Sequence, residues 1–160
     1  MAKKRKTWRE KLAGSKDLPR VVKITPQMAG RWGTKPGDTV VIPHPKEVDE
    51  IMKGVPQGKL ITINKIREKV AKKHKATIGC PITCGIFARI AAGAADEEAK
   101  EGKKKITPYW RTLKAGGVIN EKYPGGVTAQ KKLLEKEGHK ITKKGKKYVV
   151  VDFEKHLVKL

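Results

Sequence analysis

Residues 63–95, INKIREKVAKKHKATIGCPITCGIFARIAAGAA, decide how this chain folds. Apolar side chains recur about every 3.6 positions in the first part, at Ile63, Ile66 and Val70, and lysines fill positions between them. This spacing predicts a helix with one apolar stripe and one basic face. A glycine then interrupts the pattern, and Pro81 fits the first turn of a second helix. We therefore expect two helices joined by a glycine-bearing connection, which is typical of a helix-turn-helix.

The charge of the chain points to a polyanionic partner. Its 160 residues include 38 Lys and Arg but 16 Asp and Glu, a formal net charge of +22. Nucleic acids are the commonest polyanions in a cell, so we expect a nucleic-acid-binding protein. No apolar run approaches the ~18 residues that span a bilayer, and no hydrophobic signal segment follows the basic start. We therefore expect a cytoplasmic protein with no membrane partner.

The second helix has two different sides. Its bulky residues share one side and are expected in the core; they are Ile82, Ile86, Phe87, Ile90 and Ala94. The other side is mostly small, with Arg89 near its edge, and would let the backbone approach a groove closely. This predicts the DNA-contact set Thr83, Cys84, Gly85, Ala88, Arg89 and Ala92. Packing of the same small residues against a neighbouring helix is the alternative, and both interpretations stay open.

The flanking segments predict a β annex and a hairpin. Two β-branched runs before residue 43 are joined through Lys35-Pro36-Gly37-Asp38, which is typical of a type II turn. With the basic tail they form an annex of residues 1–43, whose candidate core anchors are Trp8 and Trp32. Residues 44–160 form the main domain and include a C-terminal, wing-like hairpin. Its tip lysines are expected to contact phosphates, although they would also keep a hairpin soluble; they are Lys143, Lys144, Lys146 and Lys147.

The cysteines and histidines do not predict a metal site. Cys80 and Cys84 are too few for a disulfide framework, and their spacing is that of neither a redox pair nor a zinc knuckle. The four histidines are scattered singly. We therefore expect no metal and no other cofactor. The fold class expected from the whole pattern is α+β and mainly helical: a winged helix-turn-helix domain with a small N-terminal β annex and a C-terminal hairpin.

The order of three motifs resembles a known family. A Val-Pro-x-Gly-Lys turn at 55–59 precedes the helix pair, Pro108-Tyr109-Trp110-Arg111 follows it, and a Leu-Leu-x-x-Glu-Gly ending lies at 133–138. Over about residues 46–142 this arrangement resembles the C-terminal, DNA-binding domain of the alkylguanine-DNA alkyltransferases, the methylated-DNA-protein-cysteine methyltransferases. The resemblance implies a winged helix-turn-helix that approaches DNA from the minor groove.

The residues that differ from the family fall on its chemistry. In that family a cysteine thiolate takes the alkyl group from a flipped-out guanine, with a histidine as base and a glutamate behind it. Pro108, Arg111 and Glu137 match, but Tyr109 stands at the cysteine position and Trp110 at the histidine position. A phenol with a pKa near ~10 is a poor alkyl acceptor at neutral pH, and an indole is no base. We therefore expect no catalytic residue and no enzyme.

The chain is thus similar to the alkyltransferase-like members that lack the reactive cysteine. The former active site becomes a pocket of Pro108, Tyr109, Trp110 and Glu137, and Arg111 joins the expected DNA contacts. Two uses of the aromatic pair stay open: stacking on an everted base, or filling the vacated pocket.

Together these observations predict a non-enzymatic protein that binds duplex or alkylated DNA in the minor groove. DNA is favoured over RNA, and the resemblance adds a repair-pathway protein as a partner. The alternative is an RNA- or ribosome-associated basic protein that retains the fold without a repair role.

Overall fold

The structure, a computed structural model, describes residues 7–14 and 16–158, so the basic tail at residues 1–6 lies outside the described residues. The α-helices within this part are α1 (Trp8–Ala13), α2 (Pro45–Lys53), α3 (Ile63–Lys73), α4 (Pro81–Lys100) and α5 (Gly126–Lys136). The strands are short: β1 (Arg20–Lys23), β2 (Thr39–Ile42), β3 (Ile61–Thr62), β4 (Ile78–Gly79), β5 (Thr112–Leu113), β6 (Ile141–Lys144) and β7 (Lys147–Val150). This confirms the expected α+β class.

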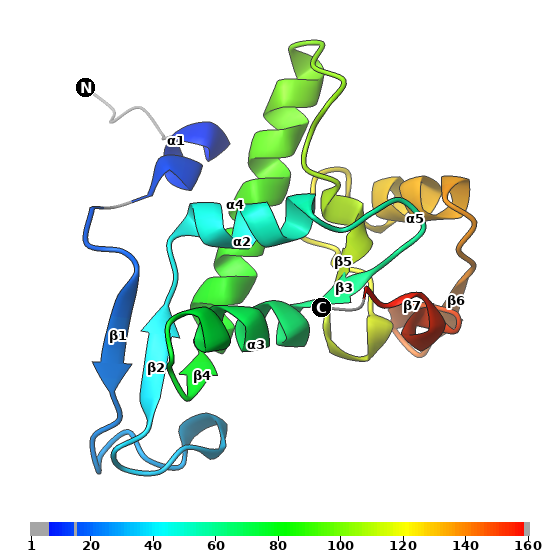
Figure 1. The fold of residues 1–160 in the computed structure, drawn as a ribbon. Coiled ribbons are helices and arrows are strands. Elements are labelled where there is room, and N and C mark those ends of the chain that lie inside the picture. The colour runs from blue at the N-terminus through cyan, green and yellow to red at the C-terminus, as the bar shows by residue number, and fades with distance from the viewer. Residues whose placement is uncertain (1–6, 15, 159–160) are drawn as a thin grey trace.

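The long helix α4 is the central element of the fold (Figure 1). It begins at Pro81, as expected, but it continues to Lys100, past the stretch ending near residue 95 that the sequence predicts. Helices α1, α2 and α3 all pack against it. The main core lies where α4 meets α2 and α3, and it includes Met52, Ile66 and Ala91.

Capping residues fix where α2 and α3 begin. The His44 ring accepts a hydrogen bond from the Lys46 N–H at 3.1 Å, while the Glu47 carboxylate accepts one from the His44 N–H at 2.7 Å. Thr62 caps α3 through its hydroxyl, 3.4 Å from the Lys65 nitrogen. These bonds satisfy amide groups that a helix start leaves unpaired. The starts of both helices are therefore set locally.

The annex strands are joined to the helix pair through β4. Strand β1 runs antiparallel to β2, and β2 runs parallel to β4 with Val40 opposite Ile78. At Gly79 of β4 an added Cβ would lie 2.6 Å from the carbonyl oxygen of Arg67 on α3. Only glycine permits this approach, so β4 fits closely under α3. Contacts across residue 43 thus connect the annex with the rest of the chain.

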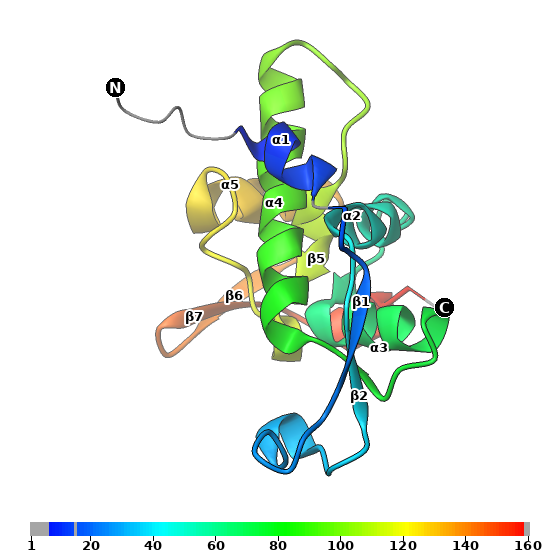
Figure 2. The ribbon, with the colours of Figure 1, turned by 90° about the vertical axis from the view of Figure 1, so that its left-hand side faces the viewer.

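A second core lies under the C-terminal third. Strand β3 pairs in parallel with β5, and the buried residues Leu60, Leu113, Leu134 and Val150 meet behind them. Strands β6 and β7 pair antiparallel and form the expected hairpin, which projects from the body beside the lower half of α4 (Figure 2). Between α4 and α5 the described chain forms only short 3-10 turns and β5.

Candidate nucleic-acid interface

The segment that carries Tyr109 and Trp110 is fixed on both sides. The Thr107 hydroxyl donates to the buried Asp49 carboxylate on α2 at 2.6 Å. A 3-10 turn, Tyr109–Arg111, follows Pro108, and β5 then pairs with β3. The segment therefore leaves little freedom to the side chains that it carries.

Glu137 is the centre of a buried polar cluster. Its carboxylate accepts hydrogen bonds from the Trp110 indole at 2.8 Å, from Arg111 Nε at 2.9 Å and Nη2 at 2.7 Å, and from the Gly58 N–H at 3.2 Å. The remaining guanidinium nitrogen of Arg111, Nη1, donates to the Val55 carbonyl at 2.7 Å. We call this group the Glu137 centre. It connects the 55–59 turn, the 108–111 segment and the end of α5, three parts that are far apart in sequence.

The electrostatics of the Glu137 centre favour a permanent carboxylate. Burial by itself would raise the pKa of Glu137, but the hydrogen bonds from Arg111, Trp110 and Gly58 outweigh burial and lower it. The Glu137 and Arg111 side chains are 7% and 14% exposed. Every nitrogen of the guanidinium is engaged inside the protein, so the expectation that Arg111 contacts DNA is wrong. Arg111 instead satisfies the buried charge of Glu137.

Aromatic rings fill the space beside this centre. Tyr109 packs edge-to-face against Trp110 and Tyr123, with ring centroids 5.4 and 5.7 Å apart. Tyr109 is 6% exposed, and burial, followed by the nearby Asp96 charge, raises the pKa of its phenol. Pro108 is also buried, whereas Trp110 is half-buried. The four residues expected in one pocket lie together, and the rings occupy the interior there.

Neither of the two cysteine thiols is placed to act as a nucleophile. Cys80 and Cys84 are free and buried. Burial, with a smaller contribution from Cys80, raises the pKa of the Cys84 thiol to about 12. A thiol with this pKa holds almost no thiolate at neutral pH.

Three of the six α4 residues that the sequence assigned to DNA contact lie inside the protein. Cys84, Ala88 and Ala92 are fully buried, so the prediction that their side chains lie on an exposed face is wrong. Thr83 is half-buried, and its hydroxyl is a buried group with no hydrogen-bond partner among the described residues. The physical reason is packing: small side chains let α2 and α3 approach α4 closely, which leaves no room for bulky residues on that side.

The residues that α4 exposes are instead Ile82 and Ile86, which the sequence placed in the core. They are 60% and 50% exposed. Gly85 lies between them with open space beside it, and Arg89 follows one turn later and is exposed. These four residues occupy positions i, i+3, i+4 and i+7 of one helix, so they share one side. We call them the outer face of α4. The sequence pattern does not identify this face, because apolar and small residues occupy nearly the whole circumference of α4.

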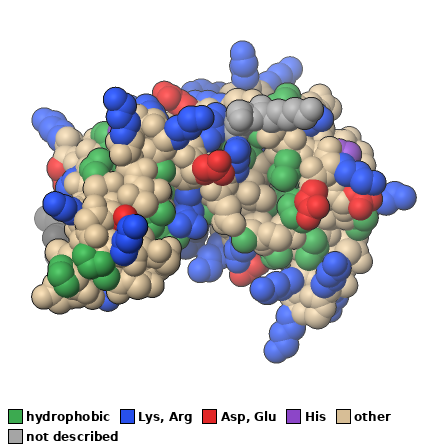
Figure 3. Space-filling model, turned by 60° about the horizontal axis from the view of Figure 1, so that its bottom comes forward, with side chains coloured by type: hydrophobic (Ala, Val, Ile, Leu, Met, Phe, Trp, Pro, Cys, Tyr) green, Lys and Arg blue, Asp and Glu red, His purple; other side chains and the backbone are tan. Residues whose placement is uncertain are grey.

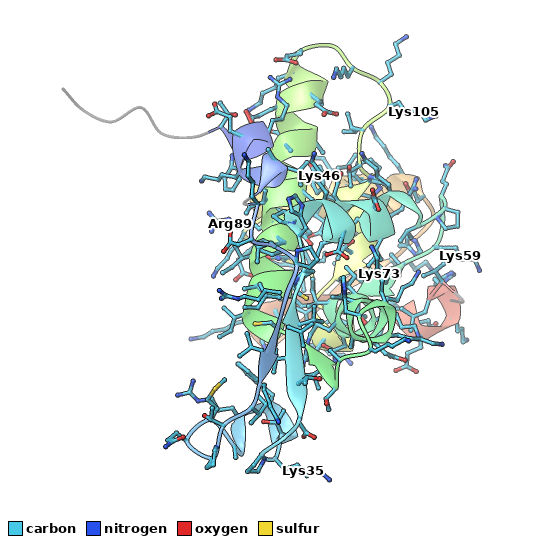
Figure 4. All side chains as sticks on the ribbon, turned by 60° about the vertical axis from the view of Figure 1, so that its left-hand side comes forward. Lys35, Lys46, Lys59, Lys73, Arg89 and Lys105 are labelled. Atoms are coloured by element: carbon cyan, nitrogen blue, oxygen red, sulfur yellow. The ribbon has the colours of Figure 1, made fainter. Side chains whose placement is uncertain are left out.

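Helix α1 supports the upper end of this face. The Trp8 ring lies against Gly93 so closely that no Cβ would fit there, and the Arg89 guanidinium lies 5.5 Å from the centre of the same ring. Arg9 also forms an ion pair with Glu101 at the far end of α4. Figure 4 shows Arg89 on the flank of α4, below α1. Trp8 is thus half-buried against α4 and not in the annex core.

Cations surround the outer face of α4. The hairpin lysines are all exposed; they are Lys143, Lys144, Lys146 and Lys147. In the described part of the chain none of them has a carboxylate within ion-pair distance, while Lys143 lies 5.9 Å from the Tyr148 ring centre. Figure 3 shows Lys and Arg side chains standing out across the lower face, with fewer Asp and Glu among them. This surface attracts polyanions.

Two further properties concern only the described residues. They contain no group of three or more His, Cys, Asp or Glu side chains placed to hold a metal ion. None of their helices combines the length and the apolar character that crossing a membrane requires.

The fold is similar to solved structures of an alkyltransferase-like protein. A crystal structure of S. pombe Atl1 in complex with damaged DNA containing O6-carboxymethylguanine matches with a TM-score of 0.50 at 19% sequence identity, covering 72% of this chain and 94% of that one. A second S. pombe ATL structure, in complex with DNA, has a TM-score of 0.46 at 17% identity with the same coverage. No protein-family model and no curated protein matches the chain. The chain therefore has an alkyltransferase-like fold, which confirms that part of the resemblance.

Proposed function

We propose that this chain is a non-enzymatic DNA-binding protein of the winged helix-turn-helix type. In this proposal α3 and α4 are the helix pair, the β6–β7 hairpin is the wing, and the outer face of α4 contacts the minor groove of a duplex. The observation that carries the proposal is this face: two half-exposed isoleucines and an arginine on one side of a helix. The likeness in fold to Atl1, solved with damaged DNA, supports it.

The chemistry of the outer face suits the minor groove. Minor-groove proteins often insert apolar wedges between base steps and thereby bend the duplex. Ile82 and Ile86 have the size and exposure for this role, and Gly85 between them allows the helix backbone to come close. Arg89 and the hairpin lysines would contact phosphates on either side. Readout is then of DNA shape and deformability, which an alkylated base changes, and not of base sequence.

The Glu137 centre supports the non-enzymatic part of the proposal. Alkyl transfer requires a nucleophile, and the buried phenol of Tyr109 with its raised pKa is a poor one. The Trp110 indole already donates its only N–H to the Glu137 carboxylate. A link to DNA repair, in which the bound duplex passes to a repair-pathway protein, belongs to this proposal and rests on the family resemblance.

A competition titration tests the proposal. Labelled duplexes, plain and alkylated at guanine, compete with structured RNA at two salt concentrations. We expect both duplexes to bind more tightly than RNA, and Ile86→Glu to weaken duplex binding by about tenfold or more. Ala99→Glu, which adds the same charge to an exposed site at the other end of α4, should change little. Tighter binding of RNA would favour the RNA-associated alternative.

Salt dependence tests the wing. Each phosphate contact that is lost lowers the slope of log affinity against log salt by about one unit. We expect this change for Lys144→Ala and Lys146→Ala. Lys105→Ala is the matched control, because exposed Lys105 follows the far end of α4 near the top of the molecule (Figure 4), whereas the hairpin lies beside the lower half of α4. Equal slopes for all three variants would mean that the hairpin does not contact DNA.

A further inference from the structure

The annex carries a partly exposed tryptophan, Trp32, that lies outside the annex core. The annex core consists of Ile24, Val40 and Cys80, with Met28 and Ile78 packed against it. Trp32, which the sequence placed in this core, is 40% exposed and makes no hydrogen bond or ring contact in the described structure. The partly exposed indole on this folded loop offers an aromatic face to a binding partner.

The loop that carries Trp32 is held in one conformation. The Gly30 N–H donates to the Thr34 carbonyl at 2.8 Å, and the Thr34 hydroxyl and N–H both donate to the Arg31 carbonyl, at 2.6 and 3.0 Å. Trp32 between them has φ +54°, a left-handed conformation that bulky residues rarely adopt. The ring is therefore presented by a preordered support, which we call the annex tip (residues 28–37).

The annex is basic, and its tip projects beyond the first turn of α4 (Figure 2). Residues 20–42 contain Arg20, Lys23, Arg31 and Lys35 but a single acid, Asp38, whose carboxylate accepts the Lys35 N–H at 2.9 Å. In Figure 2 the annex tip extends below the first turn of α4, while the β6–β7 hairpin projects sideways beside the lower half of that helix. Figure 4 shows Lys35 at the lower end of the molecule. A duplex held by the first turns of α4 would therefore lie between elements that carry cations: the hairpin beside the helix and the annex tip beyond its N-terminal end.

The chemistry of this tip fits an unpaired nucleotide. An exposed indole stacks on any base because every base has a π-face, and neighbouring cations hold the phosphates. Inside a duplex the faces of the bases are covered by their neighbours, so a ring on a loop finds a free face only where a strand is unpaired. We propose that the annex tip binds a single-stranded segment that adjoins the duplex held by α4, with Trp32 stacked on a base. The duplex part of this arrangement rests on the proposed function.

Two DNA probes test this inference: a blunt duplex, and the same duplex with a short oligo-dT overhang. The full chain should bind the overhang probe more tightly by about 5- to 150-fold, the range of one base–aromatic stack. Trp32→Ala should remove this preference and leave blunt-duplex affinity unchanged. Trp32→Phe, which keeps a ring, should retain most of it. Val21→Ala, a truncation at another exposed site of the annex, should retain all of it.

The outcomes separate this inference from the proposed function. Binding of the blunt duplex without any preference for the overhang overturns the inference and leaves the proposed function standing. Failure to bind the blunt duplex, together with Trp32-dependent binding of free oligo-dT, overturns the proposed function and supports the single-strand site. Vesicles containing phosphatidylserine provide the third arm: if Trp32→Ala loses vesicle binding but not the overhang preference, the tip serves a lipid surface and the inference is overturned.

Discussion

The Glu137 centre and the outer face of α4 invert the usual distribution of side chains. The centre buries a carboxylate and a guanidinium and satisfies them with hydrogen bonds from three parts of the chain. The outer face leaves two isoleucines in water. A buried charge pair with complete partners holds structure together, whereas exposed apolar groups with no partner inside the protein are available to something outside it. The chemically richest residues are therefore structural, and the plain aliphatic residues are the candidates for recognition.

The largest expected effect follows from the buried side of α4. Ala88 is fully buried, so Ala88→Glu would place an unpaired charge in the main core. We expect this variant to lose more than about 4 kcal/mol of unfolding free energy, enough to unfold a marginal domain. Urea denaturation measures the loss. A folded Ala88→Glu protein would mean that the small residues of α4 are accessible, and the contrast between the two sides would disappear.

The next effect concerns the Glu137 centre. Glu137→Ala leaves the Arg111 guanidinium buried without its partner, and we expect a loss of about 3–5 kcal/mol. Glu137→Gln keeps the shape and one of the two acceptor oxygens, so it should lose less, about 1–3 kcal/mol. Glu135→Ala, an exposed carboxylate on α5, is the control and should change stability by less than about 0.5 kcal/mol. If all three lose the same amount, the centre is not a structural unit.

A smaller effect tests whether the outer face of α4 contacts DNA. Gly85 lies inside α4 with open space beside it, so Gly85→Ala should stabilise the protein by about 0.5–1 kcal/mol. The added methyl group stands where the helix would approach the duplex, so the same variant should bind DNA more weakly. Thermal denaturation and titration of one preparation give both values. A gain in stability without weaker binding would place the contact elsewhere.

The smallest effect is a pH dependence near the second core. His139 is buried edge-to-face against His156, and burial followed by repulsion from His156 lowers the pKa of its ring. The unfolded chain therefore binds a proton at a higher pH than the folded chain does. Stability contributed by neutral His139 is complete above pH 6.5 and declines as the pH falls from there toward the folded pKa. His139→Phe should flatten this part of the stability profile, as denaturation at pH 7.5 and 5.5 would show.

The elements that the sequence predicts well are those with local signals. The turn at 35–38 has the expected hydrogen bond, from the Asp38 N–H to the Lys35 carbonyl, with Gly37 at positive φ. The hairpin and the start of α4 at Pro81 are likewise where the turn residues and the proline put them. In each case the deciding residues are neighbours in the chain, so no distant contact can override them.

The errors concern distant contacts. The sequence offers Arg111 as a free cation, but Glu137, 26 positions later, folds back and takes its donors. The sequence also offers two possible inward sides for α4, because apolar and small residues alternate around it. Close packing by α2 and α3 selects the small side, and that choice depends on how three helices meet. Spacing within one helix carries no information about it.

The parallel pairing of β2 with β4 has a practical consequence. Cys80 follows β4 and is covered by Ile24 and Val40, so a thiol-alkylating reagent reaches it only when β1 and β2 lift away from the helices. Cys84, one turn further into α4, stays shielded until that helix itself comes loose. The alkylation rate of Cys80 would therefore report the opening of the β1–β2 strand pair. The alkylation rate of Cys84 would report the unfolding of α4.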